Sequence, residues 1–382
     1  MRRTCRRWGA VLVLAGGVAG AWSLCAAAQQ PSPAATAVAG DAPADPGPLA
    51  SDLSGEMHSK AIRAMMRKVA DWELARIATQ PMSRSWDWGT LDLGLMAASR
   101  TLGDGKYADY VYSVGERFGW KIEHTQTPAN DYALAQALID ACHGNGKTLA
   151  AIRLRLDGDL EDPFDPSTPV WRSADALFFE APTAAELSAI TGDDTYNAFV
   201  RREWHRTEKL LYDPGQHLFQ ASALQPNHTK TARANGMAMT GLVRTIAMLP
   251  GDDPLRPAYV QRLREMAAAL ASAQQPDGLW RPGLLDTVSY PQPDVAGSSF
   301  LVYALAWGIN HHHLDARTYV PVVERAWTGL AAHIYRDGRL GAIPPVDDET
   351  AAYTAGSSWN YGVGAFLLAA SEVDTLSQHK HW

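Results

Sequence analysis

The chain has 382 residues, of which 46% are hydrophobic and 20% charged, and its formal net charge is −7 at pH 7. This length suffices for one large domain or two smaller ones, each with a core of its own. The acidic balance argues against nucleic acid as a partner, because the phosphate backbone attracts basic surfaces.

The N-terminus has the pattern of a secretory signal peptide. Four arginines among the first seven residues precede an apolar run over 10–24, and Ala26-Ala27-Ala28 offers a small-residue cleavage site. We expect residues 1–28 to be removed, which would change the formal charge to −11 because the four arginines leave with them. The mature protein is then expected to be periplasmic or secreted by a bacterium, with no membrane span.

Residues 29–50 are rich in proline and alanine and offer little to bury, so we expect a disordered tether there. Of the three cysteines, Cys5 and Cys25 lie in the predicted leader and only Cys142 remains. An intramolecular disulfide and a cysteine-based metal site are therefore excluded for the mature chain. No internal linker interrupts the remainder, which predicts a single domain over 51–382.

Hydrophobic spacing in this domain is helical nearly throughout. Ile62, Met65, Val69 and Trp72, for example, form a stripe at intervals of three and four residues, whereas alternating strands are scarce. The chain is therefore predicted to be all-α.

A weak repeat, Gly-Asp-x-x-Tyr, occurs at 103–107 and again at 192–196. In each copy we expect the glycine to end one helix, the aspartate to cap the next, and the tyrosine to pack back on the hairpin. Repeated helical hairpins indicate a solenoid or a closed toroid, and this length fits a toroid of about six hairpins.

The segment 171–182, WRSADALFFEAP, holds one aspartate among aromatic and apolar neighbours. Such surroundings disfavour an ionised carboxylate, so Asp175 is a candidate general acid that keeps its proton near neutral pH. The alternative is a buried aspartate that caps a helix or pairs with an arginine.

Two further charged residues lie where helices are predicted to begin. Asp131, which follows Asn130, would be a second inward-facing carboxylate or only a helix cap. Arg233 precedes an apolar helix and would bind a substrate carboxylate through its guanidinium, or else bridge two helices.

Several tryptophans lie at predicted helix ends, among them Trp171 and Trp280. An aromatic face in a groove can stack on a sugar ring, although ordinary packing is the alternative. Arg281 follows an Asp-Gly turn that is expected at the rim of the toroid, where ligand contacts concentrate.

Metal and cofactor chemistry find no support in the sequence. His311-His312-His313 cannot present three ligands on one helix face, and phosphate-binding loops, dinucleotide-binding turns and serine elbows are missing from the sequence. We therefore expect neither a metal nor an organic cofactor.

Taken together, these segments resemble glycoside hydrolase family 105, the unsaturated rhamnogalacturonyl hydrolases. The resemblance covers about residues 60–373. Its anchors, in order, are NDYALAQAL (130–138), WRSADALFFEAP (171–182), ITGDDTYNAFVRREW (190–204), RANG (233–236), QQPDGLWRPGLLD (274–286), GSSFLVYALAWGIN (297–310) and YGVGAFLLAASEV (361–373).

The resemblance implies an (α/α)6 barrel and a hydrolase of oligosaccharides that end in a 4,5-unsaturated uronic acid. In the implied reaction, an aspartate protonates the double bond at C4, water adds at C5, and the hemiketal opens to release the next sugar. By motif position, Asp175 matches the general acid/base and Asp131 a second acidic residue that orients water or substrate. Groove contacts are implied for Trp171, Arg233, Trp280 and Arg281, and positions near the barrel mouth for Asp294 and Tyr361.

The chain departs from the family pattern at the turn after Arg233. Ala234 and Met237 stand where relatives usually carry glycine and tryptophan, so an aromatic platform is expected to be missing. A non-catalytic relative that binds uronate oligosaccharides is therefore one alternative, and an (α/α)6 lyase or epimerase is another. The sequence predicts neither the parent polysaccharide nor the oligomeric state.

Overall fold

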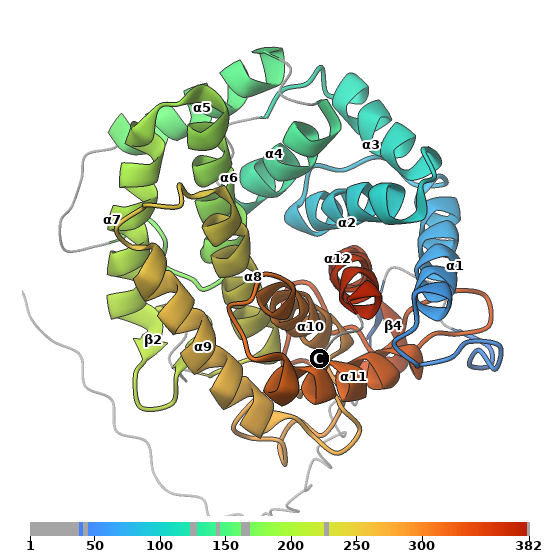
Figure 1. The fold of residues 1–382 in the computed structure, drawn as a ribbon. Helices are drawn as coiled ribbons and strands as arrows, with labels where there is room; N and C mark the ends of the chain where they lie inside the picture. The colour runs from blue at the N-terminus through green and yellow to red at the C-terminus, as the bar shows by residue number, and fades with distance from the viewer. Residues whose placement is uncertain are drawn as a thin grey trace, which may run out of the picture. The chain divides into compact units, whose positions relative to one another are not determined.

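Within the described residues, six helices form a closed inner ring and six more surround it (Figure 1). The computed structural model describes residues 38–40, 45–122, 128–142, 146–161, 169–224 and 229–379, all in one compact unit. The predicted signal peptide, residues 1–28, lies outside the described residues.

The two layers alternate along the chain. The inner helices are α2 (Trp86–Leu102), α4 (Pro128–Cys142), α6 (Ala176–Thr191), α8 (Ala232–Met248), α10 (Val295–Asn310) and α12 (Asn360–Gln378). The outer helices are α1 (Ser59–Ile77), α3 (Lys106–Arg117), α5 (Gly146–Glu161), α7 (Asp194–Leu211), α9 (Arg256–Ala273) and α11 (Ala316–Ala331). Each inner helix contacts the next, and α12 contacts α2, which closes the ring. The predicted (α/α)6 barrel is confirmed.

Burial explains why the two layers differ in sequence. Every residue of α10 from Val295 to Ile309 is buried, because the helix has neighbours on all sides, so it needs no polar face. In the outer helix α11, by contrast, Val323, Trp327 and Leu330 are buried at the spacing of a single face.

The Gly-Asp-x-x-Tyr repeat has the structure expected of it, except that Gly105 rather than Asp104 occupies the capping position of α3. Gly103 and Gly192 follow α2 and α6 in the left-handed conformation, with φ of 65° and 72°. Asp193 caps α7 by accepting a backbone N–H from its first turn. Tyr107 and Tyr196 are buried against the hairpins that they follow. Each copy therefore turns an inner helix into an outer one.

Glycines let the inner helices approach one another closely. A Cβ atom on Gly364 of α12 would lie 2.2 Å from the carbonyl oxygen of Thr90 in α2. One on Gly241 of α8 would lie 2.0 Å from the carbonyl oxygen of Leu177 in α6. The backbones occupy the space of the missing side chains, so only glycine fits at these positions.

Within the part of the chain that the structure describes, four short strands accompany the barrel. β2 (Tyr212–Asp213) and β3 (Leu218–Phe219) form an antiparallel hairpin after α7. β1 (Val38–Gly40) pairs in parallel with β4 (Tyr353–Ser358), which leads into α12.

The ordered contacts of the domain begin before the predicted boundary at residue 51. The backbone N–H of Ala50 donates to the carbonyl of Ile334 at 2.9 Å, and Leu49 forms a bridge with Tyr335. Residues 45–50 and β1 are therefore held by the connection between α11 and α12, which corrects the expectation of a disordered tether for these positions. The proline- and alanine-rich composition does not reveal backbone hydrogen bonds to a distant loop.

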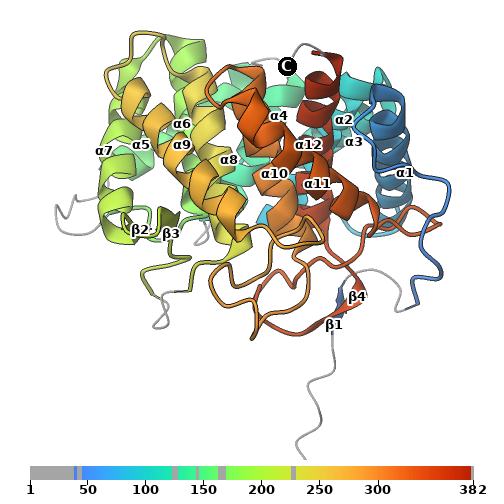
Figure 2. The ribbon, with the colours of Figure 1, turned by 60° about the horizontal axis from the view of Figure 1, so that its bottom comes forward.

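All six inner helices begin at the same end of the barrel, because each is preceded by an outer helix that runs in the opposite direction. Figure 2 shows the β1–β4 pair and the long connections that precede α10 and α12 gathered at this end. We call it the N-terminal end of the barrel. Among the described residues, no helix combines the length and apolar character needed to cross a bilayer.

Candidate active site

The first turns of the inner helices bring together five of the eight residues predicted from the sequence. Asp131 lies in the first turn of α4, and Asp175 is the residue that precedes α6. Arg233 is the second residue of α8, Asp294 precedes α10, and Tyr361 is the second residue of α12. Residues from five separate stretches of the chain therefore share the N-terminal end of the barrel.

Asp175 is half-buried, and its side chain makes no capping hydrogen bond with α6. Its backbone carbonyl instead accepts the N–H groups of Phe178 and Phe179. Across the described part of the chain, its carboxyl group has no hydrogen-bond or ion-pair partner. The structure therefore shows neither alternative, a cap or a partner of arginine, and the carboxyl group remains available to a ligand.

Two further carboxyl groups lie near Asp175 and were not among the predicted site residues. Burial raises the pKa of Glu180 well above its ordinary value, and the charges of Asp159 and Asp175 add to this rise. Burial also raises the pKa of Glu349, against the attraction of Arg233, and Asp175 again adds to the rise. Asp175 therefore has two glutamates nearby whose ionisation is disfavoured by burial.

Glu180 belongs to the same motif as Asp175. A carboxyl group inside an apolar run is the sequence signal by which Glu180 could have been predicted as a site residue. Glu349 lies in the polar segment DDET (347–350), which has no local pattern that predicts burial. Only the fold brings that segment against α8.

Asp131 is held by an ion pair with the outer layer. Nε of Arg155, in α5, donates to Oδ2 of Asp131 at 3.0 Å, and both side chains are buried. The same guanidinium also pairs with Asp159. In the residue before Asp131, Oδ1 of Asn130 accepts the backbone N–H of Trp86 at 2.8 Å. The first turn of α4 thus ties α5 and α2 together.

Arg233 anchors the loop that precedes β4. Its Nε lies 3.0 Å from Oε2 of Glu349, and its Nη1 donates to the carbonyls of Pro345 and Val346, each at 3.0 Å. The guanidinium lies 5.7 Å from the ring of Trp86 and 5.5 Å from that of Tyr361. Arg233 therefore bridges α8 and this loop, whereas the structural alternative predicted a bridge between two helices.

Asp294 and Tyr361 support the same corner of the barrel. Oδ1 of Asp294 caps α10 by accepting the N–H of Gly297 at 2.7 Å, and burial raises the pKa of Asp294 to about 7. The hydroxyl of Tyr361 donates to the carbonyl of Pro344 at 2.8 Å. Both residues lie at the barrel mouth, and both are fully buried.

The two predicted aromatic platforms belong to the core, which corrects the expectation of sugar stacking. Trp171 is fully buried and packs edge-on against Phe199. Trp280 is also fully buried, and its indole N–H donates to the carbonyl of Leu270 at 2.7 Å. A ring without an exposed face cannot stack on a sugar. Position at a helix end did not reveal this burial.

Trp359, which precedes α12, is half-buried at the mouth, and so is Trp86. The ring centroid of Trp86 lies 5.1 Å from that of Tyr361 and 5.8 Å from that of Phe179. An aromatic contact to a ligand is therefore expected from Trp86.

Arg281 was predicted as a groove contact. Its guanidinium instead donates to both carboxylate oxygens of Asp277, at 3.1 and 2.8 Å.

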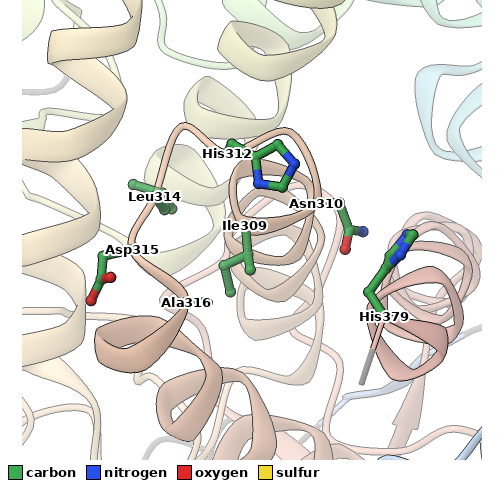
Figure 3. A pocket seen from close by; sticks show the side chains of 7 residues that line it. All are labelled: Ile309, Asn310, His312, Leu314, Asp315, Ala316 and His379. Carbon is green, nitrogen blue, oxygen red and sulfur yellow. The ribbon is translucent and has the colours of Figure 1, made fainter. Parts of the chain in front are cut away.

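A separate cavity of about 470 Å³ lies at the opposite end of the barrel, beside the last turns of α10 and α12 (Figure 3). Asn310 reaches toward His379, whereas Asp315 points away on the other side. None of the residues predicted from the sequence lines this cavity. It is thus remote from the first turns that hold Asp175 and Arg233.

The sequence pattern of Glycosyl Hydrolase Family 88 matches residues 57–377. The chain belongs to that family. This family 88 chain is therefore a glycoside hydrolase, and the match extends over the whole barrel. The non-catalytic alternative is not favoured.

Three further proteins are similar to this family 88 chain. It is 29% identical, over 351 residues, to an "Unsaturated 3S-rhamnoglycuronyl hydrolase" of Formosa agariphila, with 85% of this chain and 93% of that protein covered. A solved structure titled "Polysaccharide Lyase" is 26% identical and superposes with a TM-score of 0.78, covering 85% of this chain and 99% of the other. A possible family 105 member from Salmonella enterica, 17% identical with a TM-score of 0.68, covers 82% and 93% and shows the shared fold.

Proposed function

We propose that this glycoside hydrolase removes a terminal 4,5-unsaturated uronyl residue from oligosaccharides left by a polysaccharide lyase. The proposal is supported by membership of family 88 and by the name of the relative from Formosa agariphila. That name specifies an unsaturated "3S-rhamnoglycuronyl" unit, which supports rhamnose as the sugar next to the uronyl residue.

Asp175 is the proton donor in this proposal. The observation that carries the assignment is a carboxyl group at the start of α6, half-buried and without a protein partner, beside two carboxyl groups whose burial favours the protonated form. Hydration of an enol ether needs a proton at C4 and water at C5. One positioned acid supplies the first, and its conjugate base then accepts a proton from the water.

The products follow from the addition. Water at C5 creates a hemiketal, which opens to a keto sugar as the bond between ring oxygen and C5 breaks. The anomeric centre then releases the next sugar as a free alcohol, so the net change is the addition of one water. This route differs from displacement at the anomeric carbon, which uses a pair of carboxylates.

Asp131 is assigned a positioning role rather than proton transfer. Its pairing with Arg155 fixes the first turn of α4, which in turn fixes Trp86 through Asn130. We assign Trp86 to contact with the sugar ring, because it is the half-buried aromatic ring beside Arg233.

A periplasmic or secreted location is part of the same proposal, supported by the leader-like residues 1–28. At that location the enzyme would meet oligosaccharides that lyases release outside the cytoplasm.

The decisive experiment follows ultraviolet absorbance, because the alkene of the substrate is conjugated to its carboxylate. The purified protein is incubated with lyase-generated oligosaccharides of defined composition. Hydration removes the conjugation, so absorbance falls. A folded protein that leaves the absorbance of every such substrate unchanged contradicts the proposal, and a rise in absorbance from an intact polysaccharide would indicate a lyase instead.

A further inference from the structure

One buried side chain of α4 is hydrogen-bonded to the backbone of α6, directly after Asp175. Nε2 of Gln136, a residue that is only 1% exposed, donates to the carbonyls of Phe178 and Phe179 at 2.9 and 3.1 Å. In the ring of inner helices, α6 lies between α4 and α8 (Figure 1). Gln136 therefore joins α4 to the first turn of the helix that carries the assigned proton donor.

The carbonyl of Phe178 has no backbone donor within its own helix. Residue 182 would donate its N–H to this carbonyl in a regular α-helix, but Pro182 has no N–H, and a proline ring crowds the carbonyl four residues before it. Phe178 and Pro182 are both buried, and a buried carbonyl without a donor is costly. Gln136 thus supplies, from α4, the hydrogen bond that Pro182 removes from α6.

The side-chain amide of Gln136 has one orientation that satisfies its neighbours. On its other side, Nε of Arg244, in α8, donates to Oε1 of Gln136 at 3.1 Å. A guanidinium only donates and a backbone carbonyl only accepts, so Oε1 faces Arg244 and Nε2 faces α6. The amide therefore links three consecutive inner helices.

The backbone of α8 contacts the same turn of α6. A Cβ atom on Gly241 would overlap the carbonyl group of Leu177, so the two helices touch there through their backbones. Arg244 lies three residues after Gly241, which places both residues on one face of α8. The first turn of α6 is thus held by α8 on one side and by Gln136 on the other.

The helices that Gln136 joins both begin at the candidate site. Asp131 lies in the first turn of α4, the helix that contains Gln136. In α6, the carbonyl of Asp175 accepts the N–H groups of Phe178 and Phe179, the two residues whose carbonyls Gln136 binds. A shift of this turn would therefore move Asp175 relative to Asp131 and to the sugar.

We propose that Gln136 is a positioning residue for the proton donor. It replaces the helical hydrogen bond that Pro182 cannot form, and so fixes the first turn of α6, with Asp175, against α4. This inference rests on the proposed function, in which Asp175 protonates the substrate. Because Gln136 is buried inside the barrel, it acts through Asp175 and not on the substrate.

The test is a double-mutant cycle between Gln136 and Pro182, with kcat and KM measured from the loss of ultraviolet absorbance of lyase-generated oligosaccharides. Gln136→Met keeps the length of the side chain and removes both N–H donors. It should lower kcat by about 10-fold and change KM little, because a misplaced acid impairs the reaction rather than substrate binding. Pro182→Ala returns a backbone N–H to α6, so in that background Gln136→Met should lower kcat by about 2-fold or less.

Thr240→Val is the matched control for the loss of a buried hydrogen bond between inner helices. The hydroxyl of Thr240, in α8, donates to the carbonyl of Phe300, in α10, at 3.1 Å, and Thr240 is fully buried. Thr240→Val should lower the urea midpoint of unfolding, as Gln136→Met should, but leave kcat unchanged. If Gln136→Met does not fold, Gln136→Glu takes its place, because a carboxylate still accepts from Arg244 but offers no donor to Phe178.

A normal kcat for the Gln136 variant, or an equal loss of kcat in Thr240→Val, would overturn the inference. So would a loss of kcat that is the same with and without Pro182→Ala. Failure of the proposed function looks different: the wild type would then leave the absorbance of the unsaturated substrates unchanged, or Asp175→Asn would keep a near-normal rate.

Discussion

Nε of Arg233, at the start of α8, lies 3.0 Å from Oε2 of Glu349, in the loop before β4. The ion pair joins segments far apart in the chain, and both side chains are largely shielded from water, with exposures of 14% and 7%. Removing one partner of a shielded pair leaves the other charge uncompensated, whereas removing both does not.

Glu349→Leu should therefore destabilise the protein by about 3 kcal/mol, and the double variant Arg233→Met with Glu349→Leu should cost less than the sum of the single changes. Urea unfolding of the four proteins measures the coupling free energy. If the losses of unfolding free energy in the two single variants add up to the loss in the double variant, the interaction between Arg233 and Glu349 contributes nothing to stability.

Asp175→Asn should lower kcat by roughly 10²-fold or more with little change in folding stability, because it removes the proposed proton donor. The matched control is Asp193→Asn at the start of α7, where asparagine can still cap the helix. Ultraviolet assays of both variants decide the assignment. A near-normal rate for Asp175→Asn would place the proton donor elsewhere.

Asp92 should make stability depend on pH. It is buried in α2, neither of its oxygens has a hydrogen-bond partner within the described residues, and burial raises its pKa to about 8, with Asp87 adding to the rise. Between about pH 4 and this value the folded state holds a proton that the unfolded state, with an ordinary pKa of about 3.9, has lost. Stability attributable to Asp92 is therefore greatest at acid pH and falls as pH rises through that interval.

Asp92→Asn removes this titration and should be more stable than the wild type at pH 8, with a smaller difference at pH 5. Denaturant unfolding at the two pH values measures the effect, whose upper bound is a few kcal/mol because one pKa unit is about 1.4 kcal/mol. An equal difference at both pH values would mean that Asp92 does not titrate in this range.

Gly364→Ala should destabilise the barrel by about 1–3 kcal/mol, because the new Cβ atom would lie 2.2 Å from the carbonyl oxygen of Thr90. Gly251→Ala is the control, since a Cβ atom there meets nothing within 4 Å. Thermal unfolding of both variants tests the close approach of α2 and α12. Equal stability of the two variants would contradict it.

Local patterns were enough to predict the helical layers. The stripe from Ile62 to Val69 lies on the buried face of α1, and the Gly-Asp-x-x-Tyr repeat turns inner helices into outer ones, as expected. Both depend on interactions within one or two turns of chain. Asp175 was proposed from its neighbours in the chain, and the apolar run around it forms the first turns of a buried inner helix.

What local patterns left open was the partner of each polar or aromatic group. Asp131 and Arg233 looked alike as residues at helix starts, yet one pairs with Arg155 in α5 and the other with Glu349 in a distant loop. Trp171 and Trp280, expected at helix ends, lie in the connections before α6 and after α9, where other elements cover them. Sequence by itself thus determined which residues stand in the first turns of the helices. Only the tertiary structure decided which of them are available to a ligand and which stabilise the barrel. The physical reason is that burial and ion pairing depend on contacts between segments that are far apart in the sequence.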